Sequence, residues 1–233
     1  MNAPQLDIRN LSDRLVEVVR DFILSGAIGS DLPIRQDALA AELRVSKIPL
    51  REALARLEQD GLVILHPNRG FFVRSMSPAE AEEIYALRLK LEPDAAAHAS
   101  LLASDADRER ARQALAIFDI DAAAQKPTVG ALNRAFHLAL VQPGGQQITS
   151  NTIARLHVLA DRYVRKHLEP KGRYTRAEAE HHQILDAWLS KREARVRKLV
   201  TEHLEHTLRD LRAALAPPAQ PRTTAVRIRA SRK

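Results

Sequence analysis

The chain contains no cysteine, and this one absence excludes disulfide bonds, thiolate catalysis and cysteine-based zinc fingers. It also has no apolar run near the roughly 20 residues that a membrane-spanning helix needs. The N-terminal sequence MNAPQLDIRN lacks the basic-then-apolar pattern of a signal peptide. We therefore expect a soluble protein of the reducing cytoplasm, with no membrane partner.

Positive charge is in excess, at +7, but it is unevenly distributed along the 233 residues. Residues 1–75 carry ten Lys and Arg against ten Asp and Glu, whereas residues 217–233 carry five basic residues and no acidic ones. This last segment, Pro-rich at its start and basic at its end, is predicted to be a disordered tail. Any nucleic-acid binding by the first 75 residues must therefore depend on local clusters of basic side chains.

Residues 35–74 have the pattern of a winged helix-turn-helix. Leu39 and Leu43 give a first helix an apolar stripe. Ser46 is a good N-cap for a second helix, and Pro49 falls in the first turn of that helix, where a missing N–H does no harm. These signals predict two short helices separated by a tight turn.

The wing follows from Gly61, which ends the second helix. Two short apolar runs, residues 62–65 and 71–73, flank a hairpin tip at residues 66–70. A helix N-terminus offers backbone N–H groups to phosphate, and arginine can bond guanine in the major groove. A small helical hairpin with ordinary surface charges is the alternative, but cap, turn, helix stop and wing occur in the order that DNA binding requires. The residues expected to contact DNA are Arg35, Arg44, Ser46, Lys47, Pro49, Arg51, Asn68, Arg69 and Gly70.

Three stretches resemble the signature of the GntR family of bacterial repressors. They are VSKIPLREAL at residues 45–54, LEQDGLV at 57–63 and PNRG at 67–70. The resemblance implies that the residues at Lys47 and Arg51 read the operator, although the family more often has Arg at the first of them. Lysine keeps the charge but loses the bidentate geometry of arginine, so guanine recognition at this position is expected to weaken or to shift toward phosphate.

Helices are predicted on both sides of this motif. Residues 10–25 form one amphipathic helix whose inward side chains include Leu11 and Val18. Ser77-Pro78 marks the start of a second unit, in which no strand pattern is found. The predicted helices of this unit span residues 78–103, 105–125, 128–142, 147–168, 175–190 and 192–215. The expected fold is mainly α: a winged helix-turn-helix with a small β-hairpin wing at 1–75, an all-α bundle at 76–216 and the tail at 217–233.

Histidines carry the chemistry of the second unit. Asn133 and His137 lie one turn apart on the inward face of one helix, and His181 and His203 share the apolar faces of two others. A buried imidazole needs a hydrogen-bond partner or a metal. Each histidine taken alone is more often a satisfied core residue. Three of them aimed inward from three helices, together with an amide side chain, make a mononuclear metal site an equal alternative.

This unit resembles the helical FCD domain that accompanies GntR-type heads. The resemblance implies a divalent metal ion, with zinc or nickel favoured, held by Asn133, His137, His181 and His203. Asn133 departs from the family, which more often has Asp here. An amide oxygen can still bind the ion but brings no charge, so we expect weaker metal binding and less repulsion of an acidic effector.

The same resemblance implies that a small organic acid completes the metal coordination and that Arg88 binds its carboxylate. A pairing of Arg88 with Glu92, one helical turn away, is the equal alternative. Arg162 is a further candidate for the effector cavity. His157 we assign a structural or exposed position.

The predicted function is that of a cytoplasmic, homodimeric transcriptional regulator, a repressor more than an activator, and not an enzyme. The dimer would bind a palindromic double-stranded DNA operator under control of the effector. One alternative is a metal-free regulator that senses a larger acyl-type ligand. A less favoured one is a mononuclear metallohydrolase, for which Glu180 is the only nearby candidate base.

Overall fold

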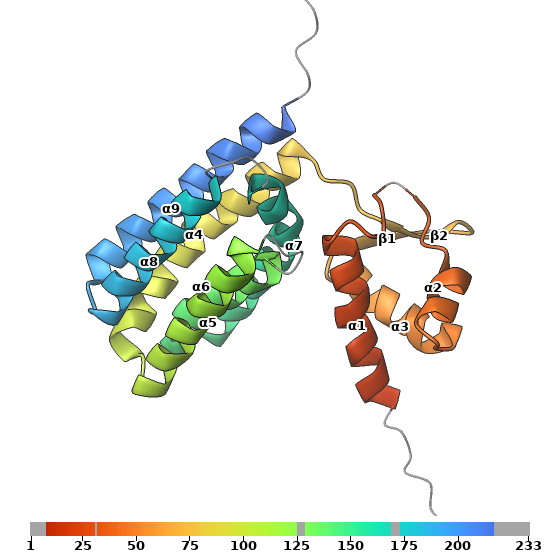
Figure 1. Ribbon diagram of the computed structural model, residues 1–233, viewed down its shortest axis with the longest axis horizontal. Coiled ribbons are helices and arrows are strands. Elements are labelled where there is room, and N and C mark those ends of the chain that lie inside the picture. Colours follow the sequence, from red (N-terminus) through yellow and green to blue (C-terminus); the bar gives the residue numbers. More distant parts are fainter. Residues whose placement is uncertain (1–7, 31, 125–128, 169–172, 217–233) are drawn as a thin grey trace, which may run out of the picture.

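The computed structural model describes residues 8–30, 32–124, 129–168 and 173–216 and shows two bodies side by side (Figure 1). The first contains α1 (Ile8–Leu24), α2 (Gln36–Glu42), α3 (Lys47–Gln59), β1 (Val63–His66) and β2 (Gly70–Val73). The second contains α4 (Pro78–Leu102), α5 (Asp105–Ala123), α6 (Val129–Val141), the 3-10 helix η1 (Gln142–Gly144), α7 (Gln147–Leu168), α8 (Arg173–Leu189) and α9 (Glu193–Leu215). The predicted fold class is confirmed. The predicted tail lies outside the described residues.

The first body, which we call the head, is held together by the apolar face of α3. Leu50, Leu54 and Leu57 are all fully buried, as their helical spacing predicts. Ser46 is the N-cap of α3, with an extended backbone and no hydrogen bond from its side chain to the helix. Its hydroxyl therefore remains available to a partner.

The inward face of α1 differs from the prediction. Leu11 and Val18 are 42% and 37% exposed, whereas Val16 is buried. Ser12 is also buried, and its hydroxyl donates to Glu52 of α3 at 3.4 Å. The buried face is thus rotated around the helix axis, because packing against α3 selects one side of a broad apolar stripe.

β1 and β2 form the antiparallel wing. Val63 pairs with Val73, and His66 pairs with Gly70, which leaves a three-residue tip. Asn68 in that tip and Gly70 after it both have positive φ, at 60° and 89°, values that asparagine and glycine tolerate best. The tip therefore turns without backbone strain.

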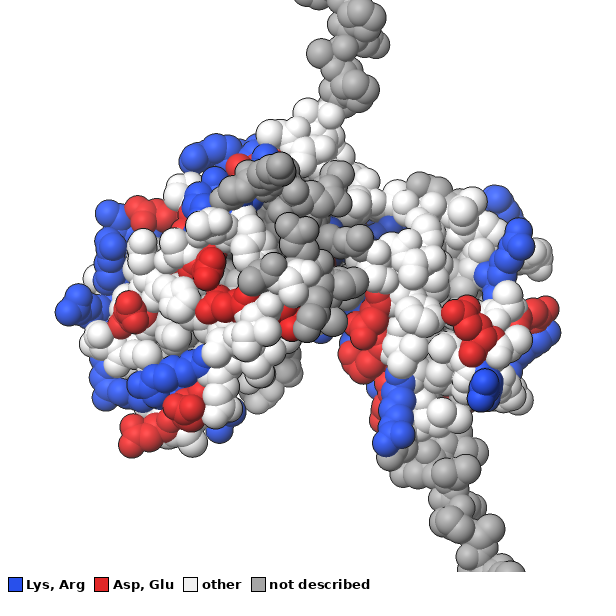
Figure 2. All heavy atoms as spheres, in the orientation of Figure 1, with Lys and Arg blue, Asp and Glu red and all other residues white. Residues whose placement is uncertain are grey.

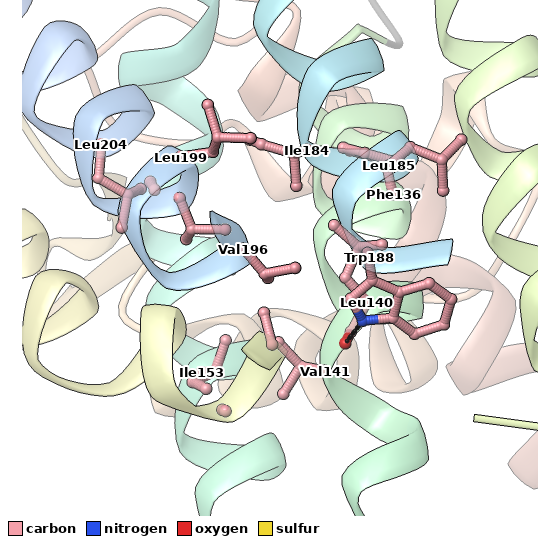
Figure 3. Close-up of a cluster of buried hydrophobic side chains, with 14 of the residues drawn as sticks. Phe136, Leu140, Val141, Ile153, Ile184, Leu185, Trp188, Val196, Leu199 and Leu204 are labelled. Atoms are coloured by element: carbon pink, nitrogen blue, oxygen red, sulfur yellow. Dashed lines mark hydrogen bonds between the residues drawn. The ribbon is translucent and has the colours of Figure 1, made fainter. Parts of the chain in front are cut away.

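The second body is a bundle in which α4 and α9 lie side by side (Figure 1). Ser77 caps α4 by accepting from Glu80 N at 3.0 Å. The core of the bundle is aliphatic except for a few aromatic rings, of which Trp188 is the largest (Figure 3). The indole of Trp188 donates to the Leu140 carbonyl at 3.0 Å, so the one polar atom of this buried side chain is satisfied.

Helix α7 lies on the side of the bundle that faces the head (Figure 1). Arg155 Nη2 donates to the Gln59 carbonyl, at the last residue of α3, at 2.7 Å. The hydroxyl of Tyr163 accepts from Ser77 N at 3.0 Å, at the link between the two bodies. One helix of the bundle thus contacts both the end of α3 and the link.

We expect the Gly61→Ala substitution to destabilise the protein by about 1–2 kcal/mol, because Gly61 has φ of +79°. An added Cβ would also lie 2.8 Å from Leu159 Cδ2 of α7, which must move aside. Gly145→Ala is the matched control, since its φ is +68° and nothing lies within 4 Å of an added Cβ. Urea denaturation should show the larger loss at Gly61. Equal losses would mean that α7 does not pack on this turn in solution.

Candidate DNA-binding surface and buried histidine site

Basic side chains gather where α3 begins. A shallow surface pocket there is lined by Arg35 and Asp37 at the start of α2 and by Lys47 and Arg51 of α3. The ammonium group of Lys47 pairs with the Asp37 carboxylate. The structure thus brings together three of the residues predicted to contact DNA, with one acidic neighbour.

The other predicted contacts lie in the turn and in the wing, with one exception. Arg44 occupies the helix-turn-helix turn with φ of 54°, and the Arg69 guanidinium lies 5.3 Å from the centre of the Phe72 ring beside the wing tip. Pro49, predicted at the DNA surface, is instead buried beside Leu50. Position 49 faces the core because it lies one helical turn before the buried Ala53, so Pro49 shapes the helix start and does not reach outward.

Charge on the visible face of the molecule is mixed. Figure 2 shows basic and acidic side chains interspersed over both bodies. Since residues 1–75 have equal numbers of each sign, any attraction to phosphate depends on the cluster at the start of α3 and on the wing.

Three histidines from three helices meet inside the bundle. His137 of α6, His181 of α8 and His203 of α9 are at most 5% exposed. The ring centres are 4.7–5.3 Å apart, and one nitrogen of each ring lies within 4.8 Å of the others. These are the three histidines whose helical faces predicted inward side chains.

Asn133 and Arg88 border the same place. Both are buried, and both line a small pocket together with His203. Its free space is about 10 Å³, roughly enough for one water molecule. The structure therefore brings the predicted metal ligands and Arg88 together, and a larger ligand would have to displace side chains to enter.

Behind the histidines, the carboxylate of Glu92 contacts three side chains. Arg88 Nε donates to Glu92 Oε2 at 2.7 Å, and His157 Nε2 donates to Glu92 Oε1 at 2.7 Å. His137 Nδ1 lies 3.3 Å from the same Oε1. Of the two alternatives for Arg88, the pairing with Glu92 is present, and it coexists with a position on the pocket wall.

His157 is fully buried, which agrees with the structural position expected for it and excludes an exposed one, but its contact with Glu92 was not predicted. With Glu92 and His137 it makes a second group of potential metal ligands. The signal was present, because Ile153, Ala160 and Val164 repeat at helical spacing around His157 and are all buried. Arg88 Nη2 lies 3.3 Å from His157 Nε2, and this positive charge disfavours a cation at that group.

Burial controls the protonation of this cluster. Desolvation lowers the pKa of His137 to about 3 and that of His157 to about 4. Burial acts in the opposite direction on Glu92, but Arg88 and the two histidines outweigh it and hold the pKa of Glu92 well below its ordinary value. At neutral pH the cluster therefore contains a carboxylate, a guanidinium and neutral imidazoles, and neutral imidazole is the form that binds metals.

The residues present fit a divalent metal ion. Nε2 of His137 is buried and has no hydrogen-bond partner among the described residues. An imidazole nitrogen in that state suits zinc, nickel or copper. A third group, formed by Asp119, Glu178 and His182, lies nearer the surface, and its His182 Nε2 is 3.0 Å from Asp119.

Arg162 lies apart from the pocket. Its guanidinium donates to the Arg74 carbonyl and lies 3.6 Å from the Glu80 carboxylate, at the link between head and bundle. The reason is its position on α7: it points toward the link, while His157 on the same helix points toward Glu92.

Two known protein families match this chain. Residues 11–73 match the family described as bacterial regulatory proteins, gntR family, and residues 83–206 match the FCD domain. Over 211 residues the chain is 25% identical to the HTH-type transcriptional repressor RspR of Escherichia coli (strain K12), a match covering 87% of this chain and 89% of that protein.

A second relative is the Nta operon transcriptional regulator of Aminobacter aminovorans, 35% identical over 108 residues. The match covers 46% of this chain and 51% of that regulator, so the chain spans about half the length of this relative, as it does of a further HTH-type regulator from Agrobacterium vitis. Among solved structures, E. coli McbR/YncC has a TM-score of 0.75 at 21% identity, covering 87% of this chain and 97% of the other. That likeness establishes the fold.

In the described part of the chain, none of the helices combines the length and apolarity needed to cross a membrane. Both matched families and the named relatives are regulatory proteins and not enzymes, so the metallohydrolase alternative has no support from them. The chain belongs to the GntR family of bacterial regulatory proteins, with an FCD domain after its winged helix-turn-helix.

Proposed function

We propose that this protein is a cytoplasmic transcriptional repressor whose affinity for a DNA operator is controlled by a small carboxylate effector, bound at a metal site in the helical bundle. Residues 1–75 form the DNA-binding domain, and residues 76–216 form the effector-binding and dimerisation domain. The observation that carries the proposal is the convergence of His137, His181 and His203 beside Arg88 and Asn133.

The DNA-binding part of the proposal rests on the start of α3. Lys47 and Arg51 are exposed there, and the unused hydroxyl of Ser46 lies beside the backbone N–H groups of the first turn. Such a helix end attracts phosphate, and Arg51 can bond guanine in the major groove. Arg69 and Asn68 in the wing would contact the adjacent backbone.

The bundle would bind a zinc or nickel ion through Asn133 and the three histidines. A bound ion of this kind offers open coordination positions to a carboxylate effector. The Arg88 guanidinium lies on the wall of the same pocket, where it can pair with that carboxylate. Because Arg88 already pairs with Glu92, an effector must compete for or share its donors.

Helix α7 offers a route from this site to the operator. Its inner face holds His157 against Glu92, and its outer face holds Arg155 against the last residue of α3. An effector that draws Arg88 away from Glu92 would change the support of His157 and so the seating of α7 on the head. The effector-free and effector-bound proteins would then differ in how the α3 helices of a dimer are spaced on a palindromic operator.

A homodimer is part of the proposal because large apolar side chains remain exposed on the bundle. Leu87, Leu101 and Leu102 of α4 and Ile117 and Ile120 of α5 are each at least 40% exposed. Exposed apolar side chains on two helices offer material for a surface that another chain covers.

The metal-free alternative, a regulator of a larger acyl-type ligand, finds less support. The pocket between the helices has free space for about one water molecule, and its walls include charged and polar side chains. An effector response that survives complete removal of metal by a chelator would favour this alternative.

We expect elemental analysis of purified, untagged protein to find about one divalent ion per chain, because three buried histidines converge beside Asn133. The His137→Ala variant should lose it. His182→Ala is the matched control, since His182 is an exposed histidine of the group formed with Asp119 and Glu178. This variant should leave the metal content unchanged. Metal retained in His137→Ala but lost in His182→Ala would place the site at the surface and contradict the proposal.

A further inference from the structure

Two carboxylates approach the histidine site from outside it. Glu180 of α8 is 2.7 Å from Nδ1 of His203 on α9, and Glu92 of α4 is 3.3 Å from Nδ1 of His137 on α6. Glu92 is buried, and the Glu180 side chain is 18% exposed. Each carboxylate therefore contacts a histidine of another helix through the ring nitrogen that is nearer the backbone.

The direction of these contacts settles which nitrogen carries the proton. A neutral imidazole has one N–H, and an ionised carboxylate can only accept a hydrogen bond. The nitrogen that faces the carboxylate must therefore be protonated, and Nε2 keeps its lone pair. For His137 the geometry agrees, because Nε2 is buried without a hydrogen-bond partner among the described residues.

We propose that Glu180 and Glu92 are positioning residues, which hold His203 and His137 as the tautomers protonated at Nδ1 and so leave both Nε2 atoms to bind a divalent transition-metal ion. This inference rests on the proposed metal site and deepens it. With the tautomers fixed in advance, no proton has to move between ring nitrogens when the ion enters. The carboxylates also make the Nε2 atoms of both rings more basic, and so better ligands for the metal ion.

The two carboxylates differ in their surroundings. The charge of Glu92 is balanced by Arg88, so its contribution is mainly orientation. Glu180 also contacts His206 Nδ1 at 2.7 Å and Arg176 at 3.5 Å, both at the edge of the bundle. Removal of the Glu180 charge leaves no buried cation unpaired, so Glu180→Gln is the variant expected to fold.

The first test needs no metal. Long-range ¹H–¹⁵N correlation spectra of the metal-free protein report which ring nitrogen of each histidine is protonated. We expect Nε2 of both His203 and His137 to be unprotonated at neutral pH. In Glu180→Gln, the neutral amide can donate to Nδ1 as well as accept from it, so the share of His203 protonated at Nε2 should rise. A wild-type protein with protonated Nε2 at His203 would overturn the inference.

The second test measures zinc affinity by competition with a chelating dye. We expect Glu180→Gln to weaken binding about ten- to hundred-fold. Asp186→Asn is the matched control, because it removes the same charge from the same helix while Asp186 is exposed and belongs to none of the candidate ligand groups. Equal losses in both variants would reduce the effect to overall charge and overturn the positioning role.

A double variant separates the effect of lost charge on zinc affinity from the effect of the changed His203 tautomer. Adding Asn133→Asp to Glu180→Gln restores a negative charge at the site but does not return the proton of His203 to Nδ1. Affinity that stays below that of Asn133→Asp alone supports the inference, whereas full recovery contradicts it. Failure of the proposed function looks different: the wild-type protein would then bind no zinc, whatever tautomers the spectra show.

Discussion

Arg51→Ala should remove most of the specific operator affinity while the protein stays folded. Arg51 is exposed on the outer face of α3, close to Lys47 and Arg35, and makes no contact that the core needs. One arginine bonded to guanine contributes about 1–3 kcal/mol to base discrimination, and a dimer uses two of them. The expected loss in affinity is therefore roughly 30-fold or more, since each 1.4 kcal/mol is a factor of ten.

The measurement is a binding titration on duplexes that the wild-type protein selects from a random pool, at one fixed salt concentration. Arg56→Ala is the matched control, because Arg56 is another half-exposed arginine of α3 but pairs with Asp13 of α1, away from the start of the helix. We expect the control to bind as the wild type does. Operator affinity unchanged in Arg51→Ala would rule out the start of α3 as the reading surface.

The second large effect is expected at Glu92. Glu92→Gln leaves the Arg88 guanidinium buried without a counter-charge, since both side chains are at most 2% exposed. Removal of one partner from a buried ion pair costs about 3–5 kcal/mol. Chemical denaturation should show this loss, and Glu82→Gln, which breaks an exposed pair with Arg212, should change stability little.

A double variant tests whether the unpaired charge causes this loss of stability. Replacing both partners, as in Arg88→Met with Glu92→Leu, removes the unpaired charge and should recover much of the stability that Glu92→Gln loses. If the double variant is no more stable than Glu92→Gln, packing and not charge balance accounts for the effect. The same double variant should lose the effector response, because it lacks the proposed carboxylate-binding Arg88.

Stability should also depend on pH through this cluster. The folded pKa of Glu92 lies below its ordinary value of 4.5, so its contribution is present above about pH 4.5 and is lost as the pH falls through the folded pKa. Buried neutral His137 and His157 act in the same direction from pH 6.5 downward, because the unfolded chain takes up their protons first. Acid denaturation of the wild type should therefore begin in mildly acidic solution and steepen below pH 4.5.

Local patterns determined most of the architecture. Helix breaks, N-caps and the order of the wing follow from interactions between residues close together in the chain, so Ser46, Gly61 and Ser77-Pro78 marked their boundaries in the sequence. Helical spacing also placed Asn133 and His137 on one inward face. What periodicity could not supply was the exact centre of a face, which is why Leu11 and Val18 were placed inward and are exposed.

Only the tertiary structure decided which side chains contact one another. His157 lies 65 residues from Glu92 in sequence, and His203 lies 23 residues from Glu180, yet both pairs are in contact. Arg162 was placed at the link by the packing of α7 between two bodies, a relationship that no local pattern records. Side-chain type and spacing determine which residues turn inward, whereas the partner each one finds depends on how whole helices pack against one another.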